Sequence, residues 1–189
     1  MLSHMRADVE KRRFSVDEYY AMADAGILSR DDRVELVDGE ILTMRPIGPA
    51  HASAVDRAAH ALMRAAGEQA IVRVQNPIRF GPFDEPQPDL ALLRPVVGSY
   101  RTAHPQPPDI LLVVEIADSS LLYDRYVKGP LYARYGISEY WLVDLGTQTV
   151  SRHTSPERDA YQDVAIHASG ESIAPLALPD CVVRIDDLL

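Results

Sequence analysis

The order of the predicted secondary-structure elements indicates a mixed α/β (α+β) domain, with a central sheet flanked by helices. A helical pattern is followed by three apolar strand patterns, and a second helical pattern is followed by the apolar strand EYWLVDL. Helices that alternate with buried strands in this way are typical of a sheet covered by helices. The chain has 189 residues, 47% of them hydrophobic, which suffices for one substantial core. We therefore expect a single domain over residues 14–189, preceded by a flexible tail over residues 1–13.

Three stretches have the pattern of helices. The first, residues 16–25, begins with a Ser-x-x-Glu capping box and ends at a glycine. The second, residues 51–67, has apolar residues at helical spacing and also ends at a glycine. The third, about residues 122–135, contains Pro130. Because proline lacks a backbone donor, we expect it to kink this helix or to start its regular part.

Strand patterns occupy the segments between and after these helices. The stretch RVELVDGEILTM alternates around an Asp-Gly pair, which is the strongest short hairpin signal. Apolar runs predict three further strands and then a fourth after the third helix, and from residue 146 short strands with turn residues indicate an antiparallel extension. A long surface loop rich in Pro and Gly joins the second and third of these runs. The predicted strands span residues 33–37, 40–44, 70–80, 88–94, 109–117 and 139–145.

Composition and missing motifs exclude several classes of protein. The formal net charge of −9 opposes indiscriminate attraction to nucleic acid, so a site for a polyanion has to be local. A single cysteine, Cys181, excludes an intramolecular disulfide and fits a cytoplasmic protein. We expect no signal peptide and no membrane anchor, because no apolar run is long enough. The motifs GxGxxG, GxxxxGK[ST], GxSxG, HExxH and CxxC are all absent.

Two acidic residues mark the ends of predicted buried strands. Glu115 lies near the end of PPDILLVVEIA, where a buried carboxylate costs several kcal/mol unless it is paired or bound to a metal. Asp89 lies at the start of PDLALL, and neighbouring strands could bring both carboxylates to one edge of the sheet. Two such groups repel unless a cation lies between them, and oxygen ligands suit Mg²⁺ or Mn²⁺. The alternatives are a strand-start role for Asp89 and an arginine partner for Glu115.

Two more residues complete the candidate set. Only Lys11 and Lys128 are lysines among the 19 basic residues, so a lysine in the helix that follows Glu115 is notable. Lysine supplies a compact charge and can release its proton when its pKa is lowered, which arginine cannot do. Glu35 shares one face of the predicted hairpin with an apolar neighbour. A surface lysine and a solvated hairpin glutamate are the alternative interpretations.

The set fits the hydrolysis of a phosphodiester. That reaction needs a nucleophilic water and neutralisation of the charge on the transition state, both of which bound Mg²⁺ can supply. In this hypothesis Asp89 and Glu115 hold the cation, Lys128 orients or deprotonates the water, and Glu35 lies alongside.

The segments ELVDGEI, GPAH, QPDLAL, PPDILLVVEI and KGPLYARYGISEYWLVD carry a resemblance to a known family. Together, with the spacing between them, they resemble the Uma family of bacterial endonucleases, in the PD-(D/E)XK restriction-endonuclease-like superfamily. The resemblance implies an αβββαβ core. It also implies that Asp89 and Glu115 are metal ligands, that the backbone carbonyl of Ile116 is a further metal contact, and that His51 contacts phosphate or caps the core helix.

The chain departs from the superfamily pattern in two ways. The superfamily lysine falls two residues after the acidic ligand, where this chain has Ala117, so the match requires Lys128 to reach the site from the following helix. The family commonly continues this strand with Ser-Pro, whereas Asp118 and Ser119 occur here. The superfamily's additional acid usually comes from the first core helix, and here Glu35 of the hairpin would take its place.

We therefore expect a metal-dependent endonuclease that acts on DNA. We also expect a homodimer, because cutting both strands of a duplex favours a twofold pair of sites. A non-catalytic interaction module with the same fold is the main alternative. A glycosidase, with its two carboxyl groups about 5 to 9.5 Å apart, is a third hypothesis. The arginines expected to contact DNA are Arg57, Arg64, Arg73, Arg79 and Arg125.

Overall fold

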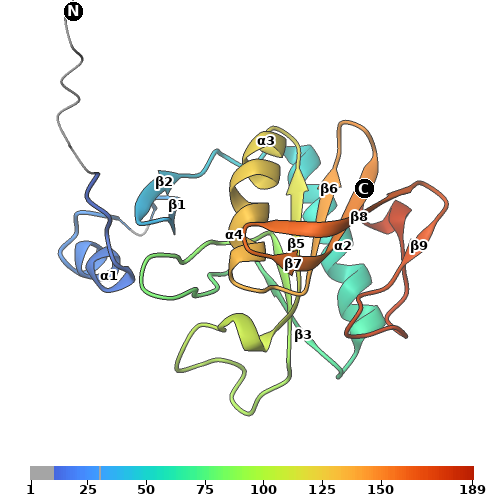
Figure 1. Cartoon of the computed structure of the whole chain (residues 1–189), viewed down its shortest axis with the longest axis horizontal. Helices are drawn as coiled ribbons and strands as arrows, with labels where there is room; N and C mark the ends of the chain where they lie inside the picture. The colour runs from blue at the N-terminus through green and yellow to red at the C-terminus, as the bar shows by residue number, and fades with distance from the viewer. Residues whose placement is uncertain (1–10, 30) are drawn as a thin grey trace, which may run out of the picture. The chain divides into compact units, whose positions relative to one another are not determined.

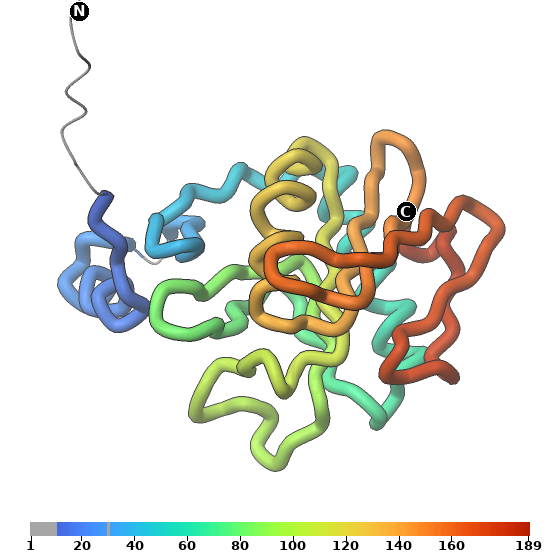
Figure 2. Tube along the Cα trace, viewed as in Figure 1, coloured from blue at the N-terminus to red at the C-terminus, as the bar shows by residue number. Residues whose placement is uncertain are grey.

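A computed structural model of the chain describes residues 11–29 and 31–189, which divide into two compact units. Unit 1 consists of Met1–Arg45 and Gly81–Pro86, and unit 2 of Pro46–Phe80 and Gln87–Leu189. Figures 1 and 2 follow the chain from blue to red through these units. Residues 1–10 of the predicted tail lie outside the described residues. That residues 14–189 act as a single domain stays a prediction.

Unit 1 contains the predicted first helix and hairpin. Helix α1 (Val16–Asp24) begins at Ser15, whose hydroxyl accepts a hydrogen bond from the amide of Glu18 while the Glu18 carboxylate accepts one from the Ser15 amide. This capping box satisfies donors that the first turn leaves unpaired. Strands β1 (Val34–Val37) and β2 (Glu40–Thr43) are antiparallel. They are joined by Asp38 and Gly39, whose φ angles of 52° and 75° form the tight turn that an Asp-Gly pair favours.

Unit 2 is built on a six-stranded mixed sheet (Figure 1). Only β5 and β6 are parallel, because the chain between them forms a helical crossover, and every other neighbouring pair is antiparallel. The spatial order is β3 (Ile71–Val74), β4 (Leu90–Leu93), β5 (Ile110–Ala117), β6 (Glu139–Asp144), β7 (Thr149–Glu157) and β8 (Ala160–Ala168).

Helix α2 (Pro49–Ala66) packs on one face of this sheet. Its buried residues are mostly alanines, which allow the helix axis to approach the strands closely. They join Leu90, Leu112 and Trp141, all 0% exposed, in the main core. Burial of each such large side chain contributes roughly 1.5–3 kcal/mol. The C-terminal elements also join this core: β9 (Ser172–Ile173), β10 (Val183–Arg184) and the 3₁₀ segment η3 (Ile185–Asp187).

The other face is covered by the crossover between β5 and β6. This crossover consists of α3 (Leu121–Tyr123), a π-helical turn η2 (Asp124–Lys128) and α4 (Gly129–Arg134). The ring of Tyr132 packs against Tyr140, whose neighbour Trp141 points to the opposite, α2 face because side chains alternate along a strand. Pro130 lies in the first turn of α4, so it starts the regular part of the helix as predicted.

The strands differ from the sequence prediction in two respects. The strand expected over residues 70–80 ends at Val74, because Gln75 has a φ of 48° and turns the chain away. Ile78 and Phe80 are nevertheless completely buried. The apolar residues after Val74 therefore belong to the core without forming a strand. Strands β7 and β8 have nine residues each and belong to the central sheet, so the expected antiparallel extension is longer than its turn-rich sequence indicated.

Candidate functional site

Asp89 and Glu115 lie next to each other in unit 2, at one end of the central sheet. Leu90 pairs with Val114 in the antiparallel ladder of β4 and β5, which places the preceding Asp89 opposite Glu115. The amide of Asp89 donates a hydrogen bond of 3.3 Å to Glu115 Oε2. Glu115 is 2% exposed, and the Asp89 side chain is 13% exposed. Strand pairing alone thus brings two carboxylates that are 26 residues apart in sequence to one place.

Glu115 is paired with Lys128. The lysine Nζ lies 3.0 Å from Glu115 Oε1, and the hydroxyl of Tyr132 donates to the same oxygen. Burial raises the pKa of Glu115 well above its usual range; the Lys128 charge opposes this, whereas Asp124 and Asp89 add to it. Lys128 is only 5% exposed, so its interpretation as a surface lysine is wrong. The cation beside Glu115 is a lysine and not the arginine of the alternative interpretation.

Asp89 is held by three donors. Its Oδ2 accepts the amide of Ile116 at 2.9 Å and lies 3.0 Å from His51 Nε2, and its Oδ1 accepts the Gln75 amide group at 3.2 Å. Burial acts to raise the pKa of Asp89, but the hydrogen bond and charge of His51, the Ile116 amide and Lys128 together lower it. The bond to Asp89 raises the pKa of His51 against the effect of burial. Asp89 is therefore stabilised as a carboxylate.

The π-helical turn η2 directs Lys128 towards the sheet. The amide of Gly129 bonds to the carbonyl of Asp124, five residues earlier, and the hydroxyl of Tyr140 donates to the same carbonyl at 3.1 Å. In this wide turn both Asp124 and Lys128 are buried. Tyr132 lies one turn after Lys128 on the same side of the helix, so both reach Glu115.

Two of the predicted roles at this site stay untested. Glu35 is 3% exposed in β1 of unit 1, and its role beside the carboxylates stays a prediction. The amide of Ile116 anchors Asp89, while the metal contact of its carbonyl also stays a prediction. Sequence reasoning missed Gln75 and Tyr132. The position of Tyr132, four residues after Lys128 in the same predicted helix, could have indicated that it faces the same site. No feature of the sequence around Gln75 indicated its role.

The donor set fits a divalent cation, although the protein side chains alone do not complete a site. Across residues 11–29 and 31–189, no group of three or more His, Cys, Asp and Glu side chains is placed to hold a metal. Two acidic side chains with backbone carbonyl and water ligands are a common arrangement for Mg²⁺. The negative charges of Asp124 and Asp89 repel the carboxylate form of Glu115 and so contribute to its raised pKa. A bound cation would relieve this repulsion.

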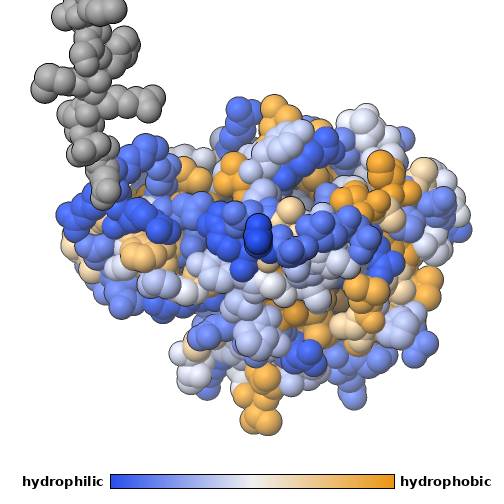
Figure 3. Space-filling view, viewed as in Figure 1, coloured by the Kyte–Doolittle hydropathy of each residue, from blue (hydrophilic) through white to orange (hydrophobic). Residues whose placement is uncertain are grey.

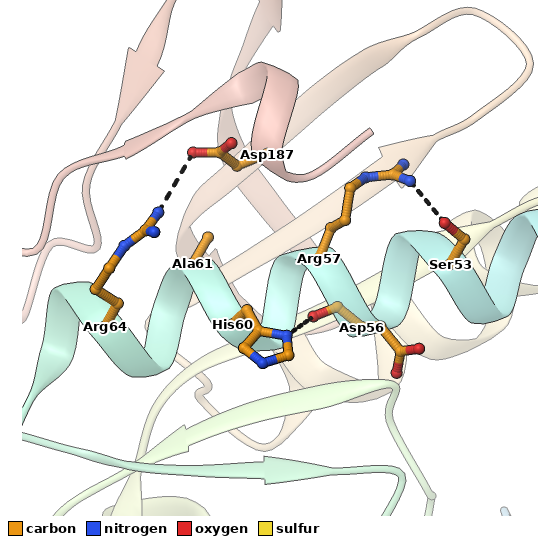
Figure 4. A pocket seen from close by; sticks show the side chains of 7 residues that line it. All are labelled: Ser53, Asp56, Arg57, His60, Ala61, Arg64 and Asp187. Carbon is orange, nitrogen blue, oxygen red and sulfur yellow. Dashed lines mark hydrogen bonds and ion pairs between the residues drawn. The ribbon is translucent and has the colours of Figure 1, made fainter.

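Two of the expected DNA-contacting arginines lie away from the carboxylates. Arg57 and Arg64 line a surface groove of 480 Å³ along α2, where Arg57 donates to Ser53 and Arg64 lies 4.0 Å from Asp187 (Figure 4). At about 100° per residue, both lie roughly 120–140° around the helix from His51. The groove also contains the exposed His60.

The mixed sheet, its two helical layers and the buried carboxylates define a restriction-endonuclease-like α/β protein. The chain belongs to the Uma2 family, described as "Putative restriction endonuclease", whose profile matches residues 16–186. This confirms the resemblance found in the sequence.

One solved structure supports the fold. A crystal structure from Anabaena variabilis, described as "a putative nuclease belonging to DUF820", superposes with a TM-score of 0.72 at 16% sequence identity. The similarity covers 93% of this chain and 97% of that one. Comparison with curated proteins gave no match. In the part of the chain that the structure describes, no helix has the length and apolar character to cross a bilayer.

Proposed function

We propose that the protein is a metal-dependent endonuclease that hydrolyses phosphodiester bonds in DNA, with Asp89 and Glu115 as ligands of Mg²⁺ or Mn²⁺. The observation that carries the proposal is the meeting of Asp89, Glu115 and Lys128, from two strands and a helix, at one buried point of a nuclease-family fold. An isolated buried carboxylate would be unfavourable. Two neighbouring carboxylates beside a buried ammonium group are unfavourable for the stability of the fold. The same arrangement is suited to binding a cation for phosphoryl transfer.

A bound Mg²⁺ would neutralise charge on the phosphate and make a water more acidic. Lys128 holds its ammonium beside Glu115 and would orient that water. The hydroxyl of Tyr132 fixes Glu115, and the Ile116 amide with His51 Nε2 fixes Asp89. The other ring nitrogen of His51, Nδ1, is buried without a hydrogen-bond partner among the described residues. Contact between His51 and a substrate phosphate would require this atom to become accessible.

Further parts of the proposal extend beyond these contacts. The Ile116 carbonyl is a third metal contact, Glu35 assists, and residues 14–189 act as one domain. The protein works in the cytoplasm as a homodimer. Arg125 is the expected arginine that lies on the same helical segment as Lys128 and is exposed, so it is the first candidate for phosphate contact.

A non-catalytic interaction module is the second candidate, and one observation favours it. All four carboxylate oxygens of Asp89 and Glu115 already accept hydrogen bonds or an ion pair from protein groups. A network satisfied in this way can be structural. The glycosidase hypothesis is weaker, because the ammonium 3.0 Å from Glu115 has no part in acid–base hydrolysis of a sugar.

Calorimetric titration with Mn²⁺ distinguishes the two candidates. The wild-type protein should bind Mn²⁺ and nick supercoiled DNA, and Asp89→Asn should lose both properties. Asp56→Asn, a matched change of an aspartate in the α2 groove, should retain both. DNA affinity should fall with rising salt, because phosphate contacts release counterions. Absence of Mn²⁺ binding that depends on Asp89 would favour the interaction module.

A further inference from the structure

Strand β8 forms an open edge of the central sheet. It pairs with β7 on one side only, and its nine residues present about 30 Å of backbone on the other. Among residues 11–29 and 31–189, Ala168 at the end of β8 bonds to Glu171; no other β8 residue has a backbone–backbone bond outside the β7 ladder. Such an edge is a template for another strand.

The edge carries few of the features that usually protect such a strand, and Asp163 is its one Asp, Glu, Lys or Arg residue. The sequence AYQDVAIHA contains no lysine, proline or glycine. Val164 and Ile166, which point to the same face, are 55% and 71% exposed. On the face of the molecule drawn in Figure 3, apolar groups are interspersed with polar ones. Natural edge strands normally carry charges, prolines or bulges that oppose association. A long edge with two exposed β-branched residues therefore favours pairing with a partner strand.

The sequence of β8 is complementary to itself in one antiparallel register. With a twofold axis at Ala165, Asp163 lies opposite His167 of a second copy, and Val164 lies opposite Ile166. The dimer thus contains two Asp163–His167 pairs on one face of the sheet and two Val164–Ile166 pairs on the other. A shift by two residues either way places Asp163 opposite Ala165 or Ser169 and removes this match. Cross-strand pairs of these kinds each stabilise a sheet by roughly 0.2–1 kcal/mol.

We propose that two copies of the chain associate through antiparallel pairing of their β8 strands about a twofold axis at Ala165. The two six-stranded sheets then become one continuous sheet, and the contact uses the same surface on both copies. The inference specifies the surface of the homodimer in the proposed function. It does not depend on nuclease activity, because none of the carboxylate site lies on β8.

Sedimentation equilibrium of the full chain tests the surface. The wild type should sediment as a dimer of twice 21.0 kDa. Val164→Lys and Ile166→Lys should each weaken dimerisation by about tenfold or more, since each places two lysines against apolar residues beside the axis. Val97→Lys, an exposed apolar position in the loop after β4, should leave the dimer intact. A monomeric wild type, or lysine variants that dimerise as tightly as Val97→Lys, would overturn the proposal.

A charge exchange tests the register. Asp163→Lys places a lysine opposite His167, and His167→Glu places a glutamate opposite Asp163, so each variant alone should associate weakly. Mixed in equal amounts, they should form a heterodimer, because the introduced lysine of one chain then meets the introduced glutamate of the other, while His167 meets Asp163. If the mixture associates no better than the separate variants, the register centred on Ala165 is wrong. Nuclease assays on the same variants separate this outcome from failure of the proposed function.

Discussion

Replacement of Lys128 by methionine should destabilise unit 2 through Glu115. Methionine keeps most of the side-chain volume but removes the ammonium 3.0 Å from Glu115 Oε1. At that distance, with an effective dielectric constant near 20, the attraction between unit charges is about 5 kcal/mol. Removal of one partner of a buried pair typically costs about 3–5 kcal/mol, because the other charge remains buried. We expect Lys128→Met to lose stability in this range at neutral pH.

The loss should depend on pH in a definite direction. Burial already raises the pKa of Glu115 well above the value of 4.5 for the unfolded chain, and loss of Lys128 raises it further. The folded variant therefore binds a proton more tightly than the unfolded one. The resulting stabilisation is complete below pH 4.5 and is lost as the pH rises through the folded pKa. The variant should be closest to wild type in acid and furthest from it at alkaline pH.

Urea unfolding followed by tryptophan fluorescence is the appropriate assay. Trp141 is the only tryptophan, and it is completely buried in β6 beside β5, so its emission reports on unit 2. The double variant Lys128→Met/Glu115→Gln removes both charges and should be more stable than the sum of the single losses predicts. The reasoning fails if Lys128→Met loses less than about 1 kcal/mol at neutral pH, or if the two single losses simply add.

The remaining predictions concern Tyr132, Ser169 and Ala58. Tyr132→Phe removes the hydroxyl that donates to Glu115 and should lower DNA cleavage more than Mn²⁺ affinity; equal losses in both assays would contradict a positioning role. Bonds from Ser169, Arg184 and the Gly170 amide lower the pKa of Asp186 to about 2, so its stabilising effect is present above pH 3.8 and is lost as the pH falls through about 2. Ser169→Ala should move the Asp186 carboxyl titration, followed by NMR, towards 3.8; an unchanged midpoint would refute this. Ala58→Leu should cost about 1–3 kcal/mol in urea unfolding, because Ala58 is 0% exposed on the buried side of α2. An equal loss in Ala58→Gly would indicate helix propensity instead of overpacking.

Local signals in the sequence predicted much of the fold. The Ser15 capping box and the Asp38-Gly39 turn depend on neighbouring residues alone, and both formed as expected. Strand β5 was evident because every one of its positions is buried. The meeting of Asp89 and Glu115 followed from antiparallel pairing of neighbouring strands.

Other features depend on contacts that a local pattern does not encode. The end of β3 at Val74 is set by the positive φ of Gln75, whose side chain bonds to Asp89 across the sheet. The length of β7 and β8 comes from their pairing, of β7 with β6 and of β8 with β7, and not from their turn-rich composition. The inward position of Lys128 depends on the π-helical turn, for which the sequence has no known local signature. The scarcity of lysine was the only hint of its importance.

That π-helical turn has a consequence for how such a site can change during evolution. One additional residue in a helical turn shifts the phase of everything that follows by about 100°. A single insertion or deletion between Asp124 and Lys128 would thus rotate the ammonium away from Glu115 while leaving the strands intact. Ala117 lies on the same face of β5 as Glu115. A lysine at position 117 would therefore approach the site from the strand and not from the following helix. A lysine supplied by the helix reaches Glu115 only if the helix has the correct rotation about its axis. The number of residues between the lysine and Glu115 therefore does not by itself show whether the two side chains meet.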